Sequence, residues 1–270
     1  MNSVSNLSII TPTLNSGRTL NSTLNSIEFL ISNGAEHIVV DSGSTDNTVD
    51  IAERAGSVVI YHPPGNMYSA INAGVALSTK DWLTYINSDD ILFSDYVLKA
   101  FQDLTPDVDF FYGDIDFIDD FGRFLFGRRA PTVRQLRLLS IYYSCVPQQG
   151  TVFRRTLFER MNGFDDSLRF VADRDFFMRC LFSGAVFKKV FGLSAAAFRL
   201  STDQLSQKSA KDMFLEGKRS TDQFLTTNDL KRTIFGRSFS DIYRWSTNID
   251  NLVLRELRGR GQDSGMRVKF

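Results

Sequence analysis

The sequence predicts an α/β protein with a mostly parallel central sheet flanked by helices, followed by a helical C-terminal extension. Through the first hundred residues, short apolar segments rich in β-branched residues alternate with longer segments of helical period. The strand segments are apolar on both faces, as expected for strands that helices cover on each side. A hydrophobic content of 43% over 270 residues is ample for a packed core.

The first half contains four predicted strands, each followed by a predicted helix. The strands are Leu7–Thr13, His37–Asp41, Ser57–His62 and Trp82–Asn87, and the helices cover residues 18–32, 44–55, 67–77 and 94–104. Short strands joined by helices are typical of βαβ units and of a parallel sheet.

The pattern changes after residue 107. Residues 109–119 alternate like a strand of a mixed sheet, and a turn at 121–123 leads to a strand at 124–128. We further predict a strand at 148–153, helices at 155–161 and 173–182, and a mostly helical segment at 211–258. Its apolar face comprises Ile242, Trp245, Ile249, Leu252 and Leu257. Without internal repeats or a low-complexity linker, we expect one domain, 1–205, and an extension, 206–270.

The net charge of zero conceals an asymmetry between the halves of the chain. Residues 1–120 hold 17 acidic against 4 basic residues, and residues 121–270 hold 14 against 27. An acidic half that binds a phosphate compound would need a cation with oxygen ligands to mediate. With only His37 and His62 in the chain, a multi-histidine zinc site is excluded.

The two cysteines and the N-terminal residues indicate the cellular compartment of the protein. Cys145 and Cys180 form no disulfide framework and no metal-ligand spacing, so we expect buried, inert thiols. No apolar run approaches the roughly 18 residues that span a bilayer, and residues 1–5 begin no secretory signal. We therefore expect a soluble, cytoplasmic protein.

Polar clusters stand at the ends of three predicted strands. They are Thr11-Pro12-Thr13, Asp41-Ser42-Gly43 and Asn87-Ser88-Asp89-Asp90. Parallel sheets bind ligands beyond the carboxyl ends of their strands, so we expect these clusters to meet in one crevice. The adjacent carboxylates of Asp89 and Asp90 need a partner, either the N-terminus of the next helix or a divalent cation.

Four segments in order carry a resemblance to a known family. They are SIITPTLNSGRTLNSTLNSI, HIVVDSGSTDNTVDIA, MYSAINAGVALSTKDWLTYINSDDIL and NGFDDSLRFVADRDFFMRC. This order resembles the family 2 nucleotide-sugar glycosyltransferases over roughly residues 5 to 200. The resemblance implies an inverting enzyme with a Rossmann-like GT-A catalytic domain at 1–205. Its halves would be a nucleotide-sugar-binding half, 1–105, and an acceptor-binding half, 106–205. No Gly-x-Gly-x-x-Gly follows the first strand, which disfavours a dinucleotide-binding site and excludes a P-loop.

The resemblance implies a donor-binding set drawn from the polar clusters and the third helix. Its members are Thr11, Pro12, Thr13, Asn15, Asp41, Ser42, Tyr68, Asn72, Asn87 and Ser88. Asp41 would accept a hydrogen bond from the nucleotide base. Taken singly, several have a simpler interpretation: Thr11-Pro12 can end a strand, Asp41 can hold a turn, and Asn72 can be a packing residue.

Residues 87–89 stand where the family has its Asp-x-Asp metal motif. Asn87 replaces the first acid, so the implied ligand to Mn²⁺ or Mg²⁺ is Asp89, while Asp90 caps the following helix or orients its neighbour. Family members often complete this site with a later histidine. Here RLSTDQ, residues 199–204, occupies that region, so water, the diphosphate or Asp203 would complete it.

The resemblance implies that Asp173 is the catalytic base, in preference to Asp175. At a predicted helix N-terminus, Asp173 would be held ionised by the helix dipole, as a general base requires. The alternative is a helix cap beside surface charges. Gln148-Gln149 is similar to the family's His-Gln pair, and with Arg174 it is expected to line the acceptor site.

The implied function is transfer of a single sugar from a nucleoside diphosphate sugar, UDP-linked as a first guess. The acceptor would be a glycan or lipid-linked hydroxyl in surface polysaccharide biosynthesis, and no nucleic acid is expected as a partner. One alternative is a binding module that has lost catalysis. Another is a sugar nucleotidyltransferase, which needs a glycine-rich basic loop that residues 15–18 match poorly.

The last forty residues suggest a surface interaction. Residues 231–270 hold nine Lys or Arg against four acids, with Tyr243 and Trp245 among them. Such a segment can rest on the anionic inner face of a membrane, where lipid-linked acceptors reside. The alternative is a solvated helix packed against the catalytic domain or against another subunit of a homo-oligomer.

Overall fold

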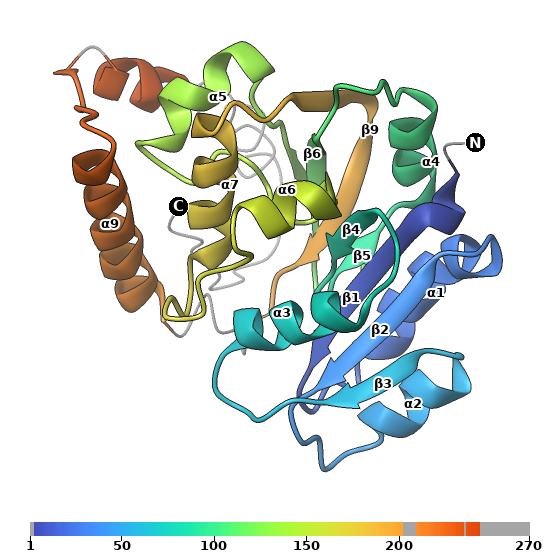
Figure 1. Ribbon diagram of the computed structural model, residues 1–270. Coiled ribbons are helices and arrows are strands. Elements are labelled where there is room, and N and C mark those ends of the chain that lie inside the picture. Colours follow the sequence, from blue (N-terminus) through green and yellow to red (C-terminus); the bar gives the residue numbers. More distant parts are fainter. Residues whose placement is uncertain (1–2, 202–208, 235, 244–270) are drawn as a thin grey trace, which may run out of the picture.

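The computed structural model describes residues 3–201, 209–234 and 236–243 (Figure 1). Its centre is a nine-stranded sheet in the order β3-β2-β1-β4-β8-β6-β9-β5, with β7 paired to β6. The strands are β1 (Leu7–Thr13), β2 (Glu36–Asp41), β3 (Val58–Tyr61), β4 (Trp82–Tyr85), β5 (Ile91–Leu92), β6 (Phe110–Ile118), β7 (Phe124–Arg128), β8 (Val152–Arg154) and β9 (Phe187–Arg199). The predicted α/β class with a flanked central sheet is confirmed.

Helices cover both faces of the sheet (Figure 1). They are α1 (Leu20–Ser32), α2 (Thr48–Arg54), α3 (Met67–Leu77), α4 (Ser94–Gln102), α5 (Val133–Ser140), α6 (Arg155–Arg160), α7 (Ala172–Phe182) and α9 (Ala210–Thr227), with a 3-10 turn at Val4–Asn6. One core packs α3, α5, α6 and α7 against the sheet, and a second packs α1, α2 and α4 against the other face. Successive residues of β1 point to opposite faces of the sheet, so Ile10 packs in the first core and Ile9 in the second.

The parallel half of the sheet brings the polar strand ends together. β1 pairs in parallel with β2 and with β4, and Thr13 lies opposite Asp41 in the register. Every residue of β1 is buried, which agrees with a strand covered on both sides. The bounds predicted for β1 and for α3 are those observed.

The second half of the chain forms the mixed part of the sheet. β8 runs antiparallel between β4 and β6, and β7 is an antiparallel edge strand, as the predicted turn at 121–123 requires. The strand predicted at 148–153 was partly wrong: only Val152–Arg154 is strand, because residues 148–151 turn at Gly150, where φ is +77°. The long strand β9 and the helix α5 were not predicted.

The C-terminal extension contains the helix α9, which lies beside α7 (Figure 1). Leu225 of α9 is buried, and the hydroxyl of Tyr142 hydrogen-bonds the backbone of Thr233, so this segment packs on the domain. The predicted apolar positions Trp245, Ile249, Leu252 and Leu257 lie outside the described residues. Within the described part of the chain, no helix is both long and apolar enough to cross a membrane.

Candidate active site

Contacts between side chains show that the polar strand ends meet. The hydroxyl of Thr13 donates to Oδ1 of Asp41 at 3.0 Å. The other carboxylate oxygen of Asp41 accepts the backbone N–H groups of Gly43 and Ser44 at 2.9 and 2.8 Å. Asp41 therefore holds its own turn, and it is buried at the edge of the predicted donor site. The backbone N–H of Ser42 donates to the carbonyl of Thr13, which closes the same corner.

The loop after β1 joins the other two clusters. Oδ1 of Asn15 accepts the backbone N–H of Thr45 at 2.9 Å, and Asn15 has a positive φ of 51°, which asparagine tolerates. The hydroxyls of Ser16 and Ser88 lie 2.7 Å apart. The predicted convergence of the three clusters on one end of the sheet is thus present in the structure.

The side chain of Thr11 contacts a histidine within the protein. Its hydroxyl lies 3.0 Å from Nε2 of His37, whose Nδ1 lies 2.7 Å from the hydroxyl of Ser57. Burial lowers the pKa of His37 to about 4, so its imidazole is neutral at physiological pH. Because the side chain of Thr11 is taken up in this way and Pro12 is buried within β1, a nucleoside would meet the backbone of this segment.

Asp90 is completely buried at the turn that follows β4. Oδ1 accepts the backbone N–H of Arg199 at 2.9 Å, and Oδ2 accepts from the amides of Asn87 and Gln149 at 3.3 Å each. Burial and the neighbouring charge of Asp89 raise the pKa of the Asp90 carboxyl well above its usual range. Of the two expectations for Asp90, a cap on the next helix was wrong, since α4 begins after Phe93 without a side-chain cap, whereas the contact with the Asn87 amide agrees with an orienting role.

Arg199 holds this turn from the end of β9. Its Nε donates to the carbonyl of Asp89 at 2.8 Å, and Nη1 donates to the carbonyls of Asp119 and Asp120 at 3.0 and 3.1 Å. The side chain is almost fully buried, so its guanidinium satisfies backbone acceptors that water cannot reach. Arg199 therefore links the turn that carries Asp89 to the hairpin between β6 and β7.

The residues at this turn fit a weakly held divalent cation. Asp89 is half-buried, and Oδ1 of Asn87 is buried without a hydrogen-bond partner among the described residues. An orphaned amide oxygen beside a carboxylate offers two hard ligands, and Mg²⁺ or Mn²⁺ commonly takes its remaining ligands from water and substrate phosphates. No group of three or more His, Cys, Asp or Glu is placed to hold a metal in the described ranges, and Asp203 lies outside them.

Asp173 lies in the first turn of α7, as predicted. Its Oδ1 accepts the hydroxyl of Tyr68 at 3.0 Å and the backbone N–H of Arg174 at 2.7 Å. Burial nevertheless raises the pKa of the Asp173 carboxyl, although both hydrogen bonds act to lower it. Burial thus opposes the ionising effect expected of the helix N-terminus. A raised pKa makes the carboxylate a stronger base.

Tyr85 connects the two acidic positions. After burial, the charges of Asp173 and Asp90 are among the causes that raise the pKa of the Tyr85 hydroxyl well above its usual range. Helix α3 begins after the carboxyl end of β3, so the hydrogen bond from Tyr68 of α3 to Asp173 places the start of α7 at the same end of the sheet as the turn after β4. This end carries the predicted donor site as well.

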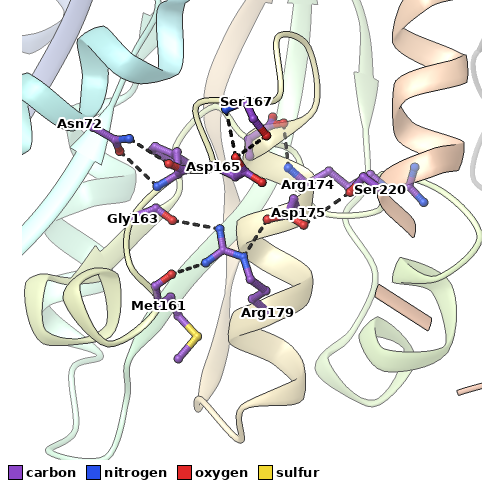
Figure 2. A network of polar contacts seen from close by, with 11 residues as sticks. Asn72, Met161, Gly163, Asp165, Ser167, Arg174, Asp175, Arg179 and Ser220 are labelled. Atoms are coloured by element: carbon purple, nitrogen blue, oxygen red, sulfur yellow. Dashed lines mark hydrogen bonds and ion pairs between the residues drawn. The ribbon is translucent and has the colours of Figure 1, made fainter. Parts of the chain in front are cut away.

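Helix α3 fixes the segment that leads to Asp173. The amide of Asn72 donates to the carbonyl of Phe164 at 2.8 Å and accepts its N–H at 3.1 Å (Figure 2). Asn66 caps α3 and donates to the carbonyls of Asp166 and Leu168. Both polar atoms of the Asn72 side chain are therefore engaged by protein, which agrees with the packing interpretation of this residue.

The three residues predicted to line the acceptor site also contact protein groups. Gln148 donates to the carbonyl of Tyr85 at 3.0 Å, and Gln149 donates to Asp90. The guanidinium of Arg174 reaches the carbonyls of Ser140 and Gly217 at 3.3 and 3.5 Å. These contacts favour a structural role for all three side chains.

Comparison with known proteins identifies the family. Residues 8–161, more than half of the chain, match the family Glycosyl transferase family 2. The chain belongs to glycosyl transferase family 2. A PGL/p-HBAD biosynthesis glycosyltransferase of Mycobacterium bovis is 32% identical over 200 residues, which cover 71% of this chain and 75% of that protein. The succinoglycan biosynthesis protein ExoU of Rhizobium meliloti is 27% identical over 187 residues, covering 60% of this chain and 53% of that protein.

Solved structures share the fold of this glycosyltransferase. S. aureus TarS in complex with UDP-GlcNAc superimposes with a TM-score of 0.60 at 18% identity, covering 81% of this chain and 66% of that one. The mannosyltransferase PcManGT of Pyrobaculum calidifontis, in complex with GDP-Man and Mn²⁺, gives 0.53 at 14% identity, covering 96% and 88%. The predicted GT-A fold and the predicted family are confirmed.

Two features of the candidate site could not be found from the sequence. Arg199 lies in a run of small and apolar residues, FGLSAAAFRL, that gives no clear strand period, so neither β9 nor its terminal arginine was predicted. The contact between Tyr68 and Asp173 spans 105 positions. Neither residue alone carries a signal for the other.

Proposed function

We propose that this protein is an inverting glycosyltransferase that moves a single sugar from a nucleoside diphosphate sugar to a hydroxyl of a glycan or lipid-linked acceptor. The supporting observation is the carboxylate of Asp173, half-buried, with a raised pKa and oriented by Tyr68 at the end of the sheet where the polar loops meet. An inverting transfer needs one such base and no second carboxylate as nucleophile.

The chemistry assigned to Asp173 is removal of the acceptor's proton. As the proton passes from the hydroxyl to the Asp173 carboxylate, the acceptor oxygen bonds to the anomeric carbon on the face opposite the diphosphate. The bond from that carbon to the phosphate oxygen breaks, and the nucleoside diphosphate leaves with the electron pair. A positioned base of this kind contributes on the order of 10²–10⁴-fold to the rate.

A divalent cation fits the same proposal. Asp89 and the amide oxygen of Asn87 would hold Mn²⁺ or Mg²⁺ beside the donor. The bound ion would offset the negative charge of the leaving diphosphate, which four basic residues in 1–120 are too few to do. With one carboxylate in place of the usual two, we expect modest affinity for the metal until the donor is bound.

A UDP-sugar is the first donor to test. TarS structures contain UDP and UDP-GlcNAc, a Mycobacterium tuberculosis glucosyl-3-phosphoglycerate synthase was solved with UDP, and the Pyrobaculum enzyme was solved with GDP-Man. The names of the relatives place them in PGL/p-HBAD biosynthesis and in succinoglycan biosynthesis. We therefore assign the protein to surface polysaccharide or glycolipid assembly, with residues 1–105 binding the donor and 106–205 the acceptor.

A thermal-shift screen of UDP, GDP, TDP and ADP, each with and without Mn²⁺, tests the donor class. A ligand that binds the folded state raises the melting temperature.

Release of nucleoside diphosphate from the matching sugar donor then tests catalysis. The variant Asp173→Asn is compared with Asp166→Asn, which changes an exposed acid in the preceding loop. Loss of turnover in Asp173→Asn alone supports the proposal. Donor binding without release or transfer in the wild type would favour the binding module, and pyrophosphate production from a nucleoside triphosphate the nucleotidyltransferase.

Peripheral membrane association is a further part of this proposal. The described portion of the extension exposes Phe214, Ile234 and Ile242, and basic residues follow in the sequence. Co-sedimentation with phosphatidylserine vesicles, for the full chain against a variant ending at Tyr243, measures the association. If the two proteins pellet equally, residues 244–270 do not contribute to membrane association.

A further inference from the structure

Helix α9 contacts the loop that precedes the candidate base. Glu216, half-buried on α9, accepts the backbone N–H of Arg169 at Oε1, 2.8 Å away, and that of Phe170 at Oε2, 2.6 Å away. Each oxygen of the carboxylate thus takes one of two consecutive N–H groups. Such charge-assisted bonds are about twice as strong as neutral ones.

The peptide groups of Phe170 connect Glu216 to the base through Tyr68. The N–H of Phe170 is held by Glu216, and its carbonyl oxygen lies 3.2 Å from the hydroxyl of Tyr68. The same hydroxyl lies 3.0 Å from Oδ1 of Asp173. A displacement of the Phe170 backbone would therefore disturb the Tyr68 hydroxyl, which contacts the Asp173 carboxylate.

The packing of α9 on α7 fixes the position of Glu216. Gly217 packs closely on α7, because a Cβ there would lie 3.1 Å from Nη1 of Arg174, and the guanidinium would have to shift to admit it. One turn further, the hydroxyl of Ser220 reaches Oδ1 of Asp175 at 3.4 Å, and Nε of Arg179 binds the other oxygen at 2.7 Å (Figure 2). Arg179 also donates to the carbonyls of Met161 and Gly163, so the loop is held at both ends.

We propose that Glu216 is a positioning residue for Asp173. By accepting the backbone N–H groups of Arg169 and Phe170, Glu216 keeps the loop that precedes Asp173, and with it the Tyr68 hydroxyl, in the position needed for proton removal. This inference rests on the proposed function. It gives the C-terminal extension a role in the reaction, although α9 lies beyond the residues 8–161 that match the family.

The test compares Glu216→Gln with Asp212→Asn, the same loss of charge at an exposed position on the same helix. A glutamine can accept one N–H but turns its own amino group toward the other. We expect Glu216→Gln to lower kcat on the order of 10- to 100-fold, the scale of a small misplacement, while the donor KM stays at its wild-type value. The acid limb of kcat should move to higher pH, because a displaced Tyr68 hydroxyl no longer favours the ionised form of the Asp173 carboxylate. Asp212→Asn should match the wild type.

A second variant and a second measurement keep the test independent of folding. Glu216→Asp retains the charge but is one methylene shorter, and it should fall between the wild type and Glu216→Gln if reach matters. Amide hydrogen exchange at Arg169 and Phe170 should quicken in both Glu216 variants and not in Asp212→Asn.

The outcomes separate this inference from the proposed function. An active wild type whose Glu216 variants exchange faster yet keep the wild-type kcat and pH profile would overturn the positioning role alone. Unchanged exchange would show that Glu216 does not hold the loop and would also overturn it. A wild type that transfers no sugar from any nucleoside diphosphate donor would overturn the proposed function first.

Discussion

The hydroxyl of Tyr68, in the first turn of α3, donates a hydrogen bond of 3.0 Å to the carboxylate of Asp173, in the first turn of α7. The bond joins the two halves of the chain at the end of the sheet where the polar loops meet. Burial raises the pKa of Asp173, whereas the Arg174 backbone N–H and the Tyr68 hydroxyl oppose the shift, so Tyr68 is one of the groups that tune and orient the carboxylate.

Tyr68→Phe should move the acid limb of the activity profile to higher pH. The hydroxyl favours the ionised form of Asp173, so its removal raises the pKa of a group whose pKa burial has already raised. We expect kcat/KM to fall several-fold near pH 6 and less near pH 8, because at higher pH the base is ionised in both proteins. Profiles of nucleoside diphosphate release over pH 5 to 9 measure this. An acid limb that stays in place would show that Tyr68 does not tune the base.

Arg199→Met should destabilise the protein and weaken donor binding together. The substitution leaves the carbonyls of Asp89, Asp119 and Asp120 without their buried donor, and we expect a loss of about 3 kcal/mol in the free energy of unfolding. Urea titration gives that loss, and calorimetric titration with UDP and Mn²⁺ gives the change in affinity. As a control, Arg123→Met removes an exposed arginine of the nearby hairpin and should leave donor affinity as it is.

His37 should make the protein less stable as the pH falls from about 6.5 to about 4. In the unfolded chain His37 binds a proton with the ordinary pKa of 6.5, whereas in the folded protein it binds one only near pH 4. Protons therefore favour the unfolded state within this window, by up to about 3 kcal/mol at its lower end. The raised pKa values of Asp90 and Asp173 act oppositely, since those carboxyls favour the folded state as the pH falls.

Comparison with His37→Asn isolates the histidine, because the carboxyls are common to both proteins. Urea midpoints at pH 7 and at pH 4.5 should fall more for the wild type than for the variant, even though the variant starts lower through the lost contacts with Thr11 and Ser57. Parallel losses in the two proteins would assign the acid sensitivity to other groups.

The first half of the fold was predictable because local patterns and tertiary structure agree there. The apolar runs at β1 and β2 are buried on both faces, and the polar residue that ends each run, Thr13 and Asp41, lies where a parallel sheet must place it. The contact between these two side chains follows directly from the register.

The second half of the fold was harder to predict from the sequence, because its elements pair with segments that are distant in the chain. β9 pairs with β6 across about seventy residues and includes two register shifts, so its side chains do not keep a simple alternation. Arg199 and Glu216 act through contacts with chain segments far away in sequence. A single sequence shows such residues as ordinary polar positions, and only the assembled structure shows what they hold.

Asn87→Asp should make the stability of the protein depend on metal. The substitution puts a second carboxylate at the turn, removes the amide that donates to Asp90, and places a negative charge beside a buried carboxyl. Without metal, like-charge repulsion and desolvation should lower the melting temperature by several degrees. With Mn²⁺, the new carboxylate replaces the unpartnered amide oxygen as a ligand and should restore the loss.

Melting curves of the wild type, Asn87→Asp and Asn87→Ala at a series of Mn²⁺ concentrations measure this dependence. Asn87→Ala removes the same donated bond without adding a charge, so it should be destabilised but insensitive to Mn²⁺. Asp89→Ala combined with Asn87→Asp should lose the rescue, because a single remaining carboxylate has no partner ligand on the protein. A rescue by Mn²⁺ that persists in this double variant would place the ion elsewhere and remove Asp89 from the proposed site.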